Sequence, residues 1–227
     1  MAQVALFDAD RTLHEDFSIF PLYEVFAAEG LVASEDSSRL QEIFAQYNNG
    51  ETEYHDFAMN TLNVAAWALR GREEATATRV ADLFFSGSEF NWFGYVVPLL
   101  SEAENARVES ILITAEPQFI AGGIVAALGM NRLFSSRFGV ELDGRFDGSV
   151  SSVLGSKQKG EITQGLAAHS SRSFAFGDSE GDIGMLELVD EAICIKPTPE
   201  LRSHAMEQGW TIIDDPHQPL EVISFSD

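Results

Sequence analysis

Two aspartates, Asp8 and Asp10, stand two residues apart directly after the apolar run of residues 4–7. Carboxylates on a loop that leaves a buried strand are costly, because each of them requires solvent or a counter-charge. A bound Mg²⁺ meets that requirement, since it favours oxygen ligands and takes one or two carboxylates together with substrate phosphate and water. The Asp-x-Asp pattern taken alone is equally typical of a turn or a helix cap.

A second pair of acids follows another apolar run. Asp178 comes directly after residues 173–177, and Asp182 stands four residues further on, where a helix is expected to begin. Asp178 also suits the N-cap of that helix, which is the structural alternative. If both runs are strands of one sheet, they deliver three or four carboxylates to the same edge, and only a cation makes such a concentration tolerable.

Thr114 and Lys159 are of types that suit a phosphate. Thr114 ends the apolar run of residues 109–114 and precedes a predicted helix, so its hydroxyl and nearby amides would face an anion, although an N-cap threonine is the alternative. The chain has only three lysines, and Lys157 and Lys159 are two of them. A lysine that points at the strand ends would balance the acids and hold a phosphate oxygen, whereas an exposed pair would do neither. We favour Lys159, because it fits the start of the next helix better.

The elements that must position these residues alternate along the chain. Short apolar runs that predict strands occupy residues 4–7, 109–114, 173–178, 191–195 and 210–214, and helical patterns occupy residues 117–128, 159–169, 181–188 and 199–208. A small hairpin is predicted over residues 136–151, with its turn at 143–144. The alternation predicts an α/β fold with a Rossmann-like parallel sheet. Such sheets bind ligands at the carboxyl ends of their strands, where Asp8, Thr114 and Asp178 lie.

Residues 17–101 carry helical patterns and no convincing strand. We interpret this block as a helical cap inserted after the first strand, lying over the strand ends. The alternative is that these helices belong to the main layer of the fold. The expected division is an α/β core of residues 1–14 and 102–227 and a helical cap of residues 15–101.

The charge balance argues against some classes of partner. The chain has 36 acidic and 14 basic residues, which gives a formal net charge of −22. A surface this acidic repels nucleic acid and anionic membranes, so neither is expected as a partner. An anionic substrate is compatible with it where a cation or a cluster of donors offsets the field. The scattered acids predict a solvated surface, of either a salt-adapted or an ordinary acidic protein.

The remaining composition predicts a folded cytoplasmic protein. Hydrophobic residues make up 45% of the chain, enough for a packed core. The single cysteine, Cys194, lies in an apolar run and is expected to be a buried structural thiol. The first residues lack the basic start of a signal peptide, and no apolar run is long enough to predict a membrane span. Monomer and homodimer both remain open.

Together these residues resemble, in this order, the four motifs of the haloacid dehalogenase superfamily of phosphohydrolases. Residues 7–13, Phe-Asp-Ala-Asp-Arg-Thr-Leu, resemble its first motif, Asp-x-Asp-x-Thr, and residues 113–115, Ile-Thr-Ala, resemble its second. Lys159 resembles the third, and residues 177–182, Gly-Asp-Ser-Glu-Gly-Asp, resemble the fourth, Gly-Asp-x-x-x-Asp. The helical block after the first motif is similar to the cap of the phosphoserine phosphatase-like branch, so the resemblance covers nearly the whole chain.

The resemblance implies a phosphatase that works by double displacement. Asp8 would attack phosphorus and form an aspartyl-phosphate. Asp10 would protonate the departing alkoxide and then deprotonate the water that cleaves the intermediate. Thr114 and Lys159 would bind the oxygens of the transferring phosphoryl group.

The resemblance also implies a metal ion and a substrate class. Mg²⁺ would be held by Asp8, the backbone carbonyl of Asp10, Asp178 and Asp182. The expected substrate is a small phosphorylated metabolite. One alternative is a phosphotransferase or phosphomutase on the same fold. Another is a phosphate-binding module without turnover, against which Asp10 argues, because binding alone requires no acid or base there.

The chain departs from the family pattern at several positions. Arg11 occupies a position where the family more often has a small residue, and it would contact either the substrate or solvent. Glu15 and Asp16 lie near the acidic cap position of phosphoserine phosphatases without matching its spacing, and the helix predicted around residues 57–69 has no arginine before Arg70. Both departures argue against phosphoserine as the substrate. His14 is expected at the surface, and one or two aromatic residues of the cap are expected to line a substrate pocket.

Overall fold

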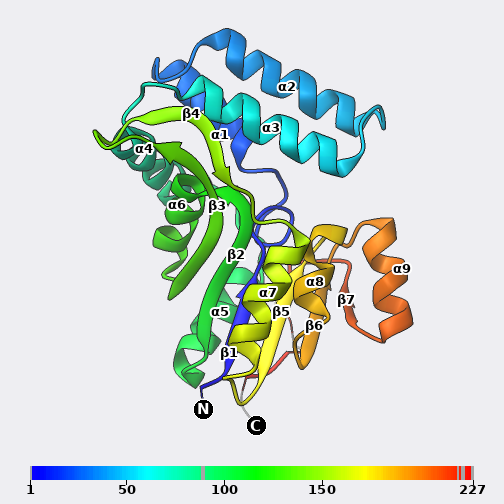
Figure 1. Cartoon of the computed structure of the whole chain (residues 1–227). Coiled ribbons are helices and arrows are strands. Elements are labelled where there is room, and N and C mark those ends of the chain that lie inside the picture. Colours follow the sequence, from blue (N-terminus) through cyan, green and yellow to red (C-terminus); the bar gives the residue numbers. More distant parts are fainter. Residues whose placement is uncertain (1, 88–89, 219, 221–222, 226–227) are drawn as a thin grey trace.

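A seven-stranded sheet forms the centre of the molecule (Figure 1). The computed structural model describes residues 2–87, 90–218, 220 and 223–225. The strands are β1 (Val4–Phe7), β2 (Glu109–Pro117), β3 (Arg132–Val140), β4 (Phe146–Ser152), β5 (Ser173–Gly177), β6 (Glu191–Ile195) and β7 (Thr211–Ile213). Their order across the sheet is β4-β3-β2-β1-β5-β6-β7.

The helices connect these strands and cover both faces of the sheet. They are α1 (Ile19–Ala28), α2 (Ser34–Asn48), α3 (Tyr54–Ala68), α4 (Glu74–Ser86), α5 (Val96–Ala106), α6 (Gln118–Leu128), α7 (Ser156–Ala167), α8 (Ile183–Leu186) and α9 (Pro199–Gln208), with a 3₁₀ turn η1 (Glu180–Asp182) before α8. Gly129 ends α6 in the left-handed conformation, with a φ of 64°, as expected for a glycine stop.

All neighbouring strands are parallel except β3 and β4, which form the predicted hairpin. The five strands expected from apolar runs are present, and the α/β fold with a helical block after β1 is confirmed. Strand β3 pairs with β2 as well as with β4, so the predicted hairpin extends the main sheet at its edge. The helix expected from residue 159 begins three residues earlier, at Ser156, after Gly155.

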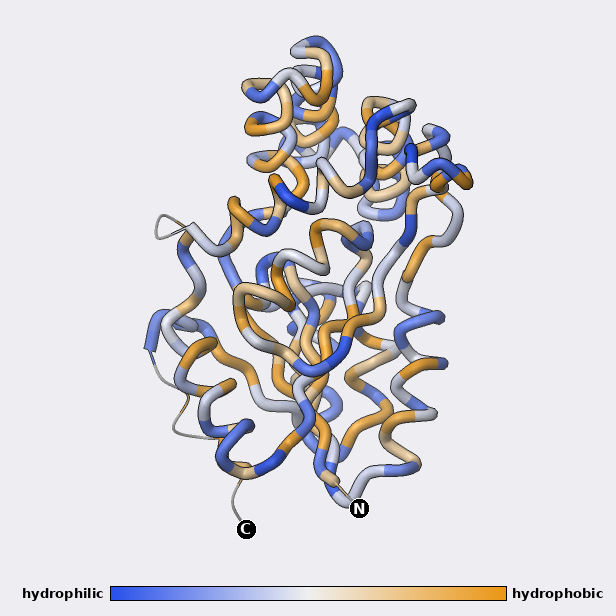
Figure 2. The backbone as a smooth tube through the Cα atoms, turned by 90° about the vertical axis from the view of Figure 1, so that its left-hand side faces the viewer, coloured by the Kyte–Doolittle hydropathy of each residue, from blue (hydrophilic) through white to orange (hydrophobic). Residues whose placement is uncertain are grey.

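Strand β1 lies in the middle of the sheet and divides its side chains between two cores. Ala5 and Phe7 belong to the core under α5 and α6, whereas Val4 and Leu6 belong to the core under α7, α8 and α9. All four are buried, as a strand covered on both faces requires. Figure 2 shows hydrophobic stretches along the inner strands and along one side of the surrounding helices.

The helices between β1 and β2 occupy two different places. Helices α2 and α3 lie beyond the upper end of the sheet in Figure 1. Helices α4 and α5 also fall within the predicted cap of residues 15–101, yet α4 packs on α6 and α5 packs on β2. The division of the chain at residues 14/15 and 101/102 therefore stays a prediction.

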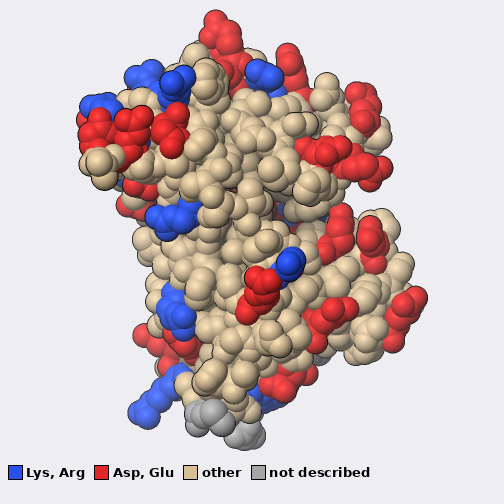
Figure 3. Space-filling view, in the orientation of Figure 1, with Lys and Arg blue, Asp and Glu red and all other residues tan. Residues whose placement is uncertain are grey.

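Acidic side chains are spread over the face shown in Figure 3, with basic side chains between them in smaller number. Cys194 is buried and free, as its apolar surroundings predict. Among the described residues no helix combines the length and the apolar composition needed to cross a bilayer.

The loop that leaves β1 is fixed to the segment before α5. The hydroxyl of Tyr95 donates a hydrogen bond to the carbonyl of Thr12 at 2.6 Å, and the amide of Phe93 donates to the carbonyl of Leu13 at 2.8 Å. Within the loop, the amide of Leu13 donates to the carbonyl of Ala9 at 2.8 Å. Since Tyr95 is fully buried, its hydroxyl connects residues far apart in sequence where water cannot replace it.

Tyr95→Phe tests whether this bond holds the loop. We expect a loss of about 1–2 kcal/mol in the free energy of unfolding, because the substitution leaves the carbonyl of Thr12 buried without its donor. Urea denaturation measures the loss. Tyr23→Phe is the matched control, since the Tyr23 hydroxyl donates to the carbonyl of Ala65 at 2.8 Å between α1 and α3, away from the loop. A comparable loss of stability in both variants supports the assignment; unchanged stability in Tyr95→Phe contradicts it.

Candidate active site

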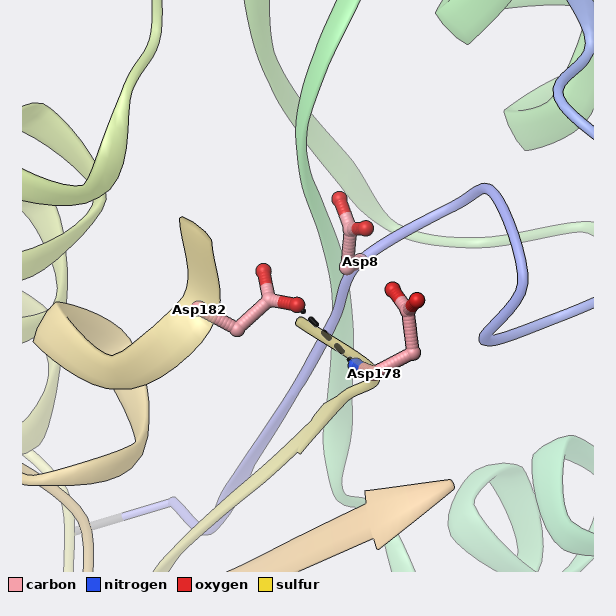
Figure 4. A group of neighbouring side chains, drawn as sticks. All are labelled: Asp8, Asp178 and Asp182. Atoms are coloured by element: carbon pink, nitrogen blue, oxygen red, sulfur yellow. Dashed lines mark hydrogen bonds between the residues drawn. The ribbon is translucent and has the colours of Figure 1, made fainter. Parts of the chain in front are cut away.

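Three carboxylates from two parts of the sequence converge at the carboxyl end of the sheet (Figure 4). Asp8 follows β1, Asp178 follows β5, and Asp182 lies in η1. Each offers an oxygen that lies within 4.8 Å of an oxygen of the other two, and all three side chains are buried. Strands β1 and β5 are neighbours paired in parallel, so the acids that follow them are brought side by side.

Lys159 is the positive charge inside this cluster. Its ammonium lies 2.7 Å from Oδ1 of Asp8 and 2.6 Å from Oδ1 of Asp182. Burial lowers the pKa of Lys159, but Asp182 and Asp8 outweigh it and raise the pKa above its ordinary value. Lys157, the alternative lysine, has a side chain that is 82% exposed and pairs with Glu161 on the outside of α7. The structure thus places Lys159, and not Lys157, among the acids.

Asp182 is held in place by backbone donors. Its Oδ2 accepts hydrogen bonds from the amides of Asp178 at 3.0 Å and of Ser179 at 3.2 Å, the first of which is drawn in Figure 4. Ser179 and Asp182 cap η1 reciprocally. Gly177 makes the close approach possible, because a Cβ at that position would lie 2.5 Å from the Cβ of Asp182.

The pKa values of the acids show the cost of this arrangement. Burial, followed by the charge of Asp182, raises the pKa of Asp8 to about 7 against the opposing effect of Lys159. Burial and the charges of Asp182 and Asp8 raise the pKa of Asp178 well above its ordinary value. The possible metal ligands are three carboxylates that repel one another. Divalent cations such as Mg²⁺ and Ca²⁺ prefer oxygen ligands of this kind.

Arg11 partly offsets the charge of Asp178. Its Nε lies 3.6 Å from Oδ2 of Asp178, and its guanidinium lies 5.9 Å from the centre of the Phe17 ring. Arg11 adopts a left-handed backbone with a φ of 57°, which is uncommon for a residue other than glycine. The sequence left contact with the substrate or with solvent open for Arg11; its side chain is 34% exposed and lines the pocket beside Asp178.

Asp10 lies outside the group of Asp8, Asp178 and Asp182 and accepts hydrogen bonds from donors of its own. Its Oδ1 accepts hydrogen bonds from the amide of Ser18 at 3.0 Å and the hydroxyl of Ser18 at 2.7 Å, and lies 3.3 Å from Nε2 of His14. Burial raises the pKa of Asp10, but the hydrogen bonds of His14, Glu116 and Ser18 together lower it below its ordinary value.

The expectation that His14 lies at the surface is wrong. Its side chain is 3% exposed, and its ring packs edge-on against Phe90 at 5.0 Å and Trp92 at 5.9 Å. The only sequence feature that indicated a place for His14 beside Asp10 was its position four residues further along the chain. The packing that buries it comes from aromatic residues more than seventy positions away, which no local pattern indicates.

Glu116 is a site residue that the sequence did not single out. It is buried, and burial together with the charge and hydrogen bond of Asp10 raises its pKa well above its ordinary value. Its amide donates a hydrogen bond to the hydroxyl oxygen of Thr114 at 3.2 Å, so Glu116 and Thr114 are oriented together. The available signal was its position two residues after Thr114, at the end of an apolar strand.

One pocket joins most of these residues, with Asp182 and His14 outside its lining. About 70 Å³ of it is open to the centre of a water molecule, and its polar end is lined by Asp8, Asp10, Arg11, Thr114, Glu116, Lys159 and Asp178. Its other walls come from α1, α2 and α3 and include Tyr47, Tyr54 and Phe57. As expected, aromatic residues of the helical block line the pocket, in larger number than the one or two predicted.

Comparison with known proteins agrees with this geometry. A sequence model of haloacid dehalogenase-like hydrolases matches residues 5–187. The chain belongs to this family. The phosphoserine phosphatase SerB1 of Mycobacterium tuberculosis is 36% identical over 222 residues, which cover 94% of this chain and 71% of that protein. The chain is therefore a phosphatase of the phosphoserine phosphatase-like branch.

Two further relatives support the family and the fold. A histidinol-phosphatase of Neisseria meningitidis serogroup C is 25% identical over 232 residues, covering 94% of this chain and 99% of its own length. The crystal structure of a protein of unknown function from Bordetella pertussis has the same fold, with a TM-score of 0.77 and 23% identity over 94% of this chain and 98% of that one. Proteins of this family generally use a divalent metal, and the three buried aspartates provide a place for one.

Lys159→Met tests the charge balance of the cluster. We expect the metal-free protein to lose about 3–5 kcal/mol in the free energy of unfolding at pH 8, because two buried carboxylates lose their counter-charge. Lys157→Met removes the same charge from the surface and should change the free energy by less than about 0.5 kcal/mol. Guanidinium denaturation of both variants gives the comparison, and equal effects of the two substitutions would show that Lys159 carries no special electrostatic role.

The raised pKa of Asp8 predicts a pH dependence of stability in the metal-free protein. The pKa of Asp8 is about 7 in the folded state and near 3.8 when unfolded, so the folded state binds more protons between these values. Its contribution to stability is complete below pH 3.8 and is lost as the pH rises towards 7, at up to about 1.4 kcal/mol per pH unit. Asp8→Asn should flatten this slope, whereas Asp56→Asn, at an exposed position on α3, should not; thermal unfolding between pH 5 and pH 8 in EDTA measures both.

Proposed function

We propose that this phosphatase is a Mg²⁺-dependent phosphomonoester hydrolase that acts on a small phosphorylated metabolite through an aspartyl-phosphate at Asp8. The observation that carries the proposal is the convergence of Asp8, Asp178 and Asp182, all buried, with the ammonium of Lys159 in contact with Asp8 and Asp182. The names of two relatives, a histidinol-phosphatase and a phosphoserine phosphatase, support a small phosphomonoester as the substrate class.

The metal would be held by Asp8, Asp178 and the backbone carbonyl of Asp10. Both oxygens of Asp182 already accept hydrogen bonds, from Lys159 and from the backbone, so Asp182 would orient the neighbouring groups from behind. When bound, Mg²⁺ would supply positive charge between an anionic nucleophile and an anionic ester, which otherwise repel each other.

In the first step a carboxylate oxygen of Asp8 forms a bond to phosphorus while the ester oxygen departs. Lys159 already contacts Asp8 and lines the pocket with Thr114, so an ammonium and a hydroxyl are available to bind phosphoryl oxygens. Positioning and charge neutralisation of this kind account for most of the catalysis in phosphoryl transfer. The pKa of Asp10 lies below its ordinary value, so the proton that Asp10 passes to the departing oxygen would come from Glu116, which hydrogen-bonds Asp10 and whose pKa is raised well above its ordinary value.

In the second step Asp10 takes a proton from water, which attacks the phosphorus of the aspartyl-phosphate and releases phosphate from Asp8. Ser18 and His14 fix one oxygen of Asp10, which leaves its other oxygen for this proton transfer. Helices α2 and α3 lie over the pocket, and we infer that they and the rest of residues 15–101 form a cap over the core of residues 1–14 and 102–227. Closure of such a cap would exclude water during the first step.

Hydrolysis of p-nitrophenyl phosphate tests the reaction. We expect release of p-nitrophenol with Mg²⁺ and none with EDTA, and we expect Asp8→Asn to lower kcat by at least about 10³-fold, because the amide is not a nucleophile. Asp56→Asn is the control for a surface charge change. Full activity in EDTA, or in Asp8→Asn, would rule out the proposed chemistry.

Asp10→Asn separates the two steps. The p-nitrophenolate group leaves with little help from an acid, so the first step should continue while hydrolysis of the intermediate slows. Intact-protein mass spectrometry should then show one added phosphoryl group, and peptide mapping should place it on Asp8. Transfer of phosphate to an added alcohol instead of water would favour a phosphotransferase, and tight phosphate binding without any turnover would favour a binding module.

A further inference from the structure

The pocket has two ends of different chemistry. One end contains the acids with Lys159 and Arg11, where the phosphate would bind. The other end is built by the loop before α1 and by α1, α2 and α3, and its lining is mostly apolar or aromatic, as at Phe17, Tyr47 and Phe57, with the Thr61 hydroxyl as a polar group. A substrate with its phosphate at Asp8 must place the rest of its alcohol against this second end.

The aromatic side chains form a packed wall. The rings of Tyr47 and Phe57 stack with their centres 4.2 Å apart and an angle of 13° between their planes. Phe17 meets Phe57 edge-on at 5.5 Å, and Phe20 stacks on Phe44 behind them at 4.6 Å. Rings that support one another in this way present a preformed apolar surface, which favours an apolar or aromatic group on the substrate.

The described residues that line the pocket include two cations, and both are already paired with acids. Lys159 contacts Asp8 and Asp182, and Arg11 contacts Asp178. A carboxylate on the substrate would therefore enter the apolar end without a counter-charge. Burying an unpaired carboxylate is strongly unfavourable, so this end selects against substrates that carry one.

Two buried polar atoms at the pocket lack a partner. The hydroxyl of Thr61 and Oε2 of Glu116 have no hydrogen-bond partner among the described residues, and both residues line the pocket. Thr61 is 5% exposed and Glu116 is 8% exposed. Buried oxygens are normally hydrogen-bonded, so both atoms can accept from a donor group on a ligand, and the Thr61 hydroxyl can also donate.

We propose that the substrate is the phosphate ester of a largely apolar alcohol that carries a hydrogen-bond donor, such as an amine, and no carboxylate. Phe17, Tyr47 and Phe57 bind the apolar part, and Thr61 and Glu116 accept from the donor. The inference rests on the proposed function for the phosphate end and adds to it the class of the leaving alcohol.

Four esters test the three features of the proposed substrate: the absent carboxylate, the apolar group and the amine. O-phosphoserine differs from O-phosphoethanolamine by the carboxylate. 2-Amino-3-phenylpropyl phosphate differs from O-phosphoethanolamine by the apolar group, and from 3-phenylpropyl phosphate by the amine. We expect kcat/KM to rise about tenfold or more on removing the carboxylate and on adding the phenyl group, and to fall about tenfold on removing the amine.

The outcomes separate this proposal from the proposed function. If p-nitrophenyl phosphate is hydrolysed with Mg²⁺ but O-phosphoserine is turned over as well as or better than O-phosphoethanolamine, the phosphatase mechanism stands and this proposal falls. An unchanged kcat/KM on adding the phenyl group likewise overturns it. If neither p-nitrophenyl phosphate nor any of the four esters is hydrolysed, the proposed function fails, and this inference fails with it.

Thr61→Val tests the acceptor with little change of shape. We expect kcat/KM for 2-amino-3-phenylpropyl phosphate to fall about tenfold, mainly through KM, and the preference over 3-phenylpropyl phosphate to shrink accordingly. Thr163→Val is the matched control, because the Thr163 hydroxyl is also buried without a partner among the described residues but lies outside the pocket. The same ratio of the two esters in both variants would overturn the role of Thr61.

Ala58→Arg tests the missing counter-charge. Ala58 lines the pocket from α3, so an arginine there would offer the apolar end a cation. We expect kcat/KM for O-phosphoserine relative to O-phosphoethanolamine to rise about tenfold. Ala45→Arg adds the same charge at an exposed position of α2 and should leave this ratio unchanged. No difference between the two variants would overturn the argument that a cation is what the pocket lacks.

Discussion

Repulsion between buried carboxylates is the constraint on which this structure depends. Asp8, Asp178 and Asp182 lie within 4.8 Å of one another, out of water, with the ammonium of Lys159 between two of them. Burial, followed by this repulsion, raises the pKa values of Asp8 and Asp178 despite the ammonium of Lys159, so the charged acids destabilise the fold where no divalent ion is bound. The same property makes the site suitable for a divalent ion, because the ion removes a cost that the folded protein already bears.

The fold meets this constraint by placing the acids on its most rigid elements. Strand β1 lies in the centre of the sheet with β2 and β5 paired to its two sides, so Asp8 has little freedom to move away from Asp178. The loop beyond Asp8 is tied to the segment before α5 through Tyr95. The core thus supplies charge in fixed positions, and the helices after β1 supply the shape and the apolar wall of the pocket.

Asp8 and Asp178 could be identified from the sequence because each directly follows a short apolar run, which is typical of a buried strand. The sequence also indicated Lys159, since the start of a helix after a hairpin could be read from neighbouring residues. It did not reveal His14 or Glu116, whose burial depends on packing between distant segments: Phe90 and Trp92 cover His14. For the same reason the place of α4 and α5 against the core could not be predicted, because an amphipathic helix does not indicate which surface it covers.

The acidity of the whole chain and the chemistry of the pocket are consistent with each other. With a net charge of −22, the protein weakens the approach of every anion at long range, although salt screens charges further apart than about 8–10 Å. An anionic phosphate can therefore bind only where a cation lies in direct contact, and the two cations of the described pocket lining both lie at its polar end. A second anionic group on the substrate would face both the unfavourable field and an apolar wall. The surface charge thus acts in the same direction as the pocket, against esters that carry a second anionic group such as a carboxylate and in favour of those whose remaining part is neutral or cationic.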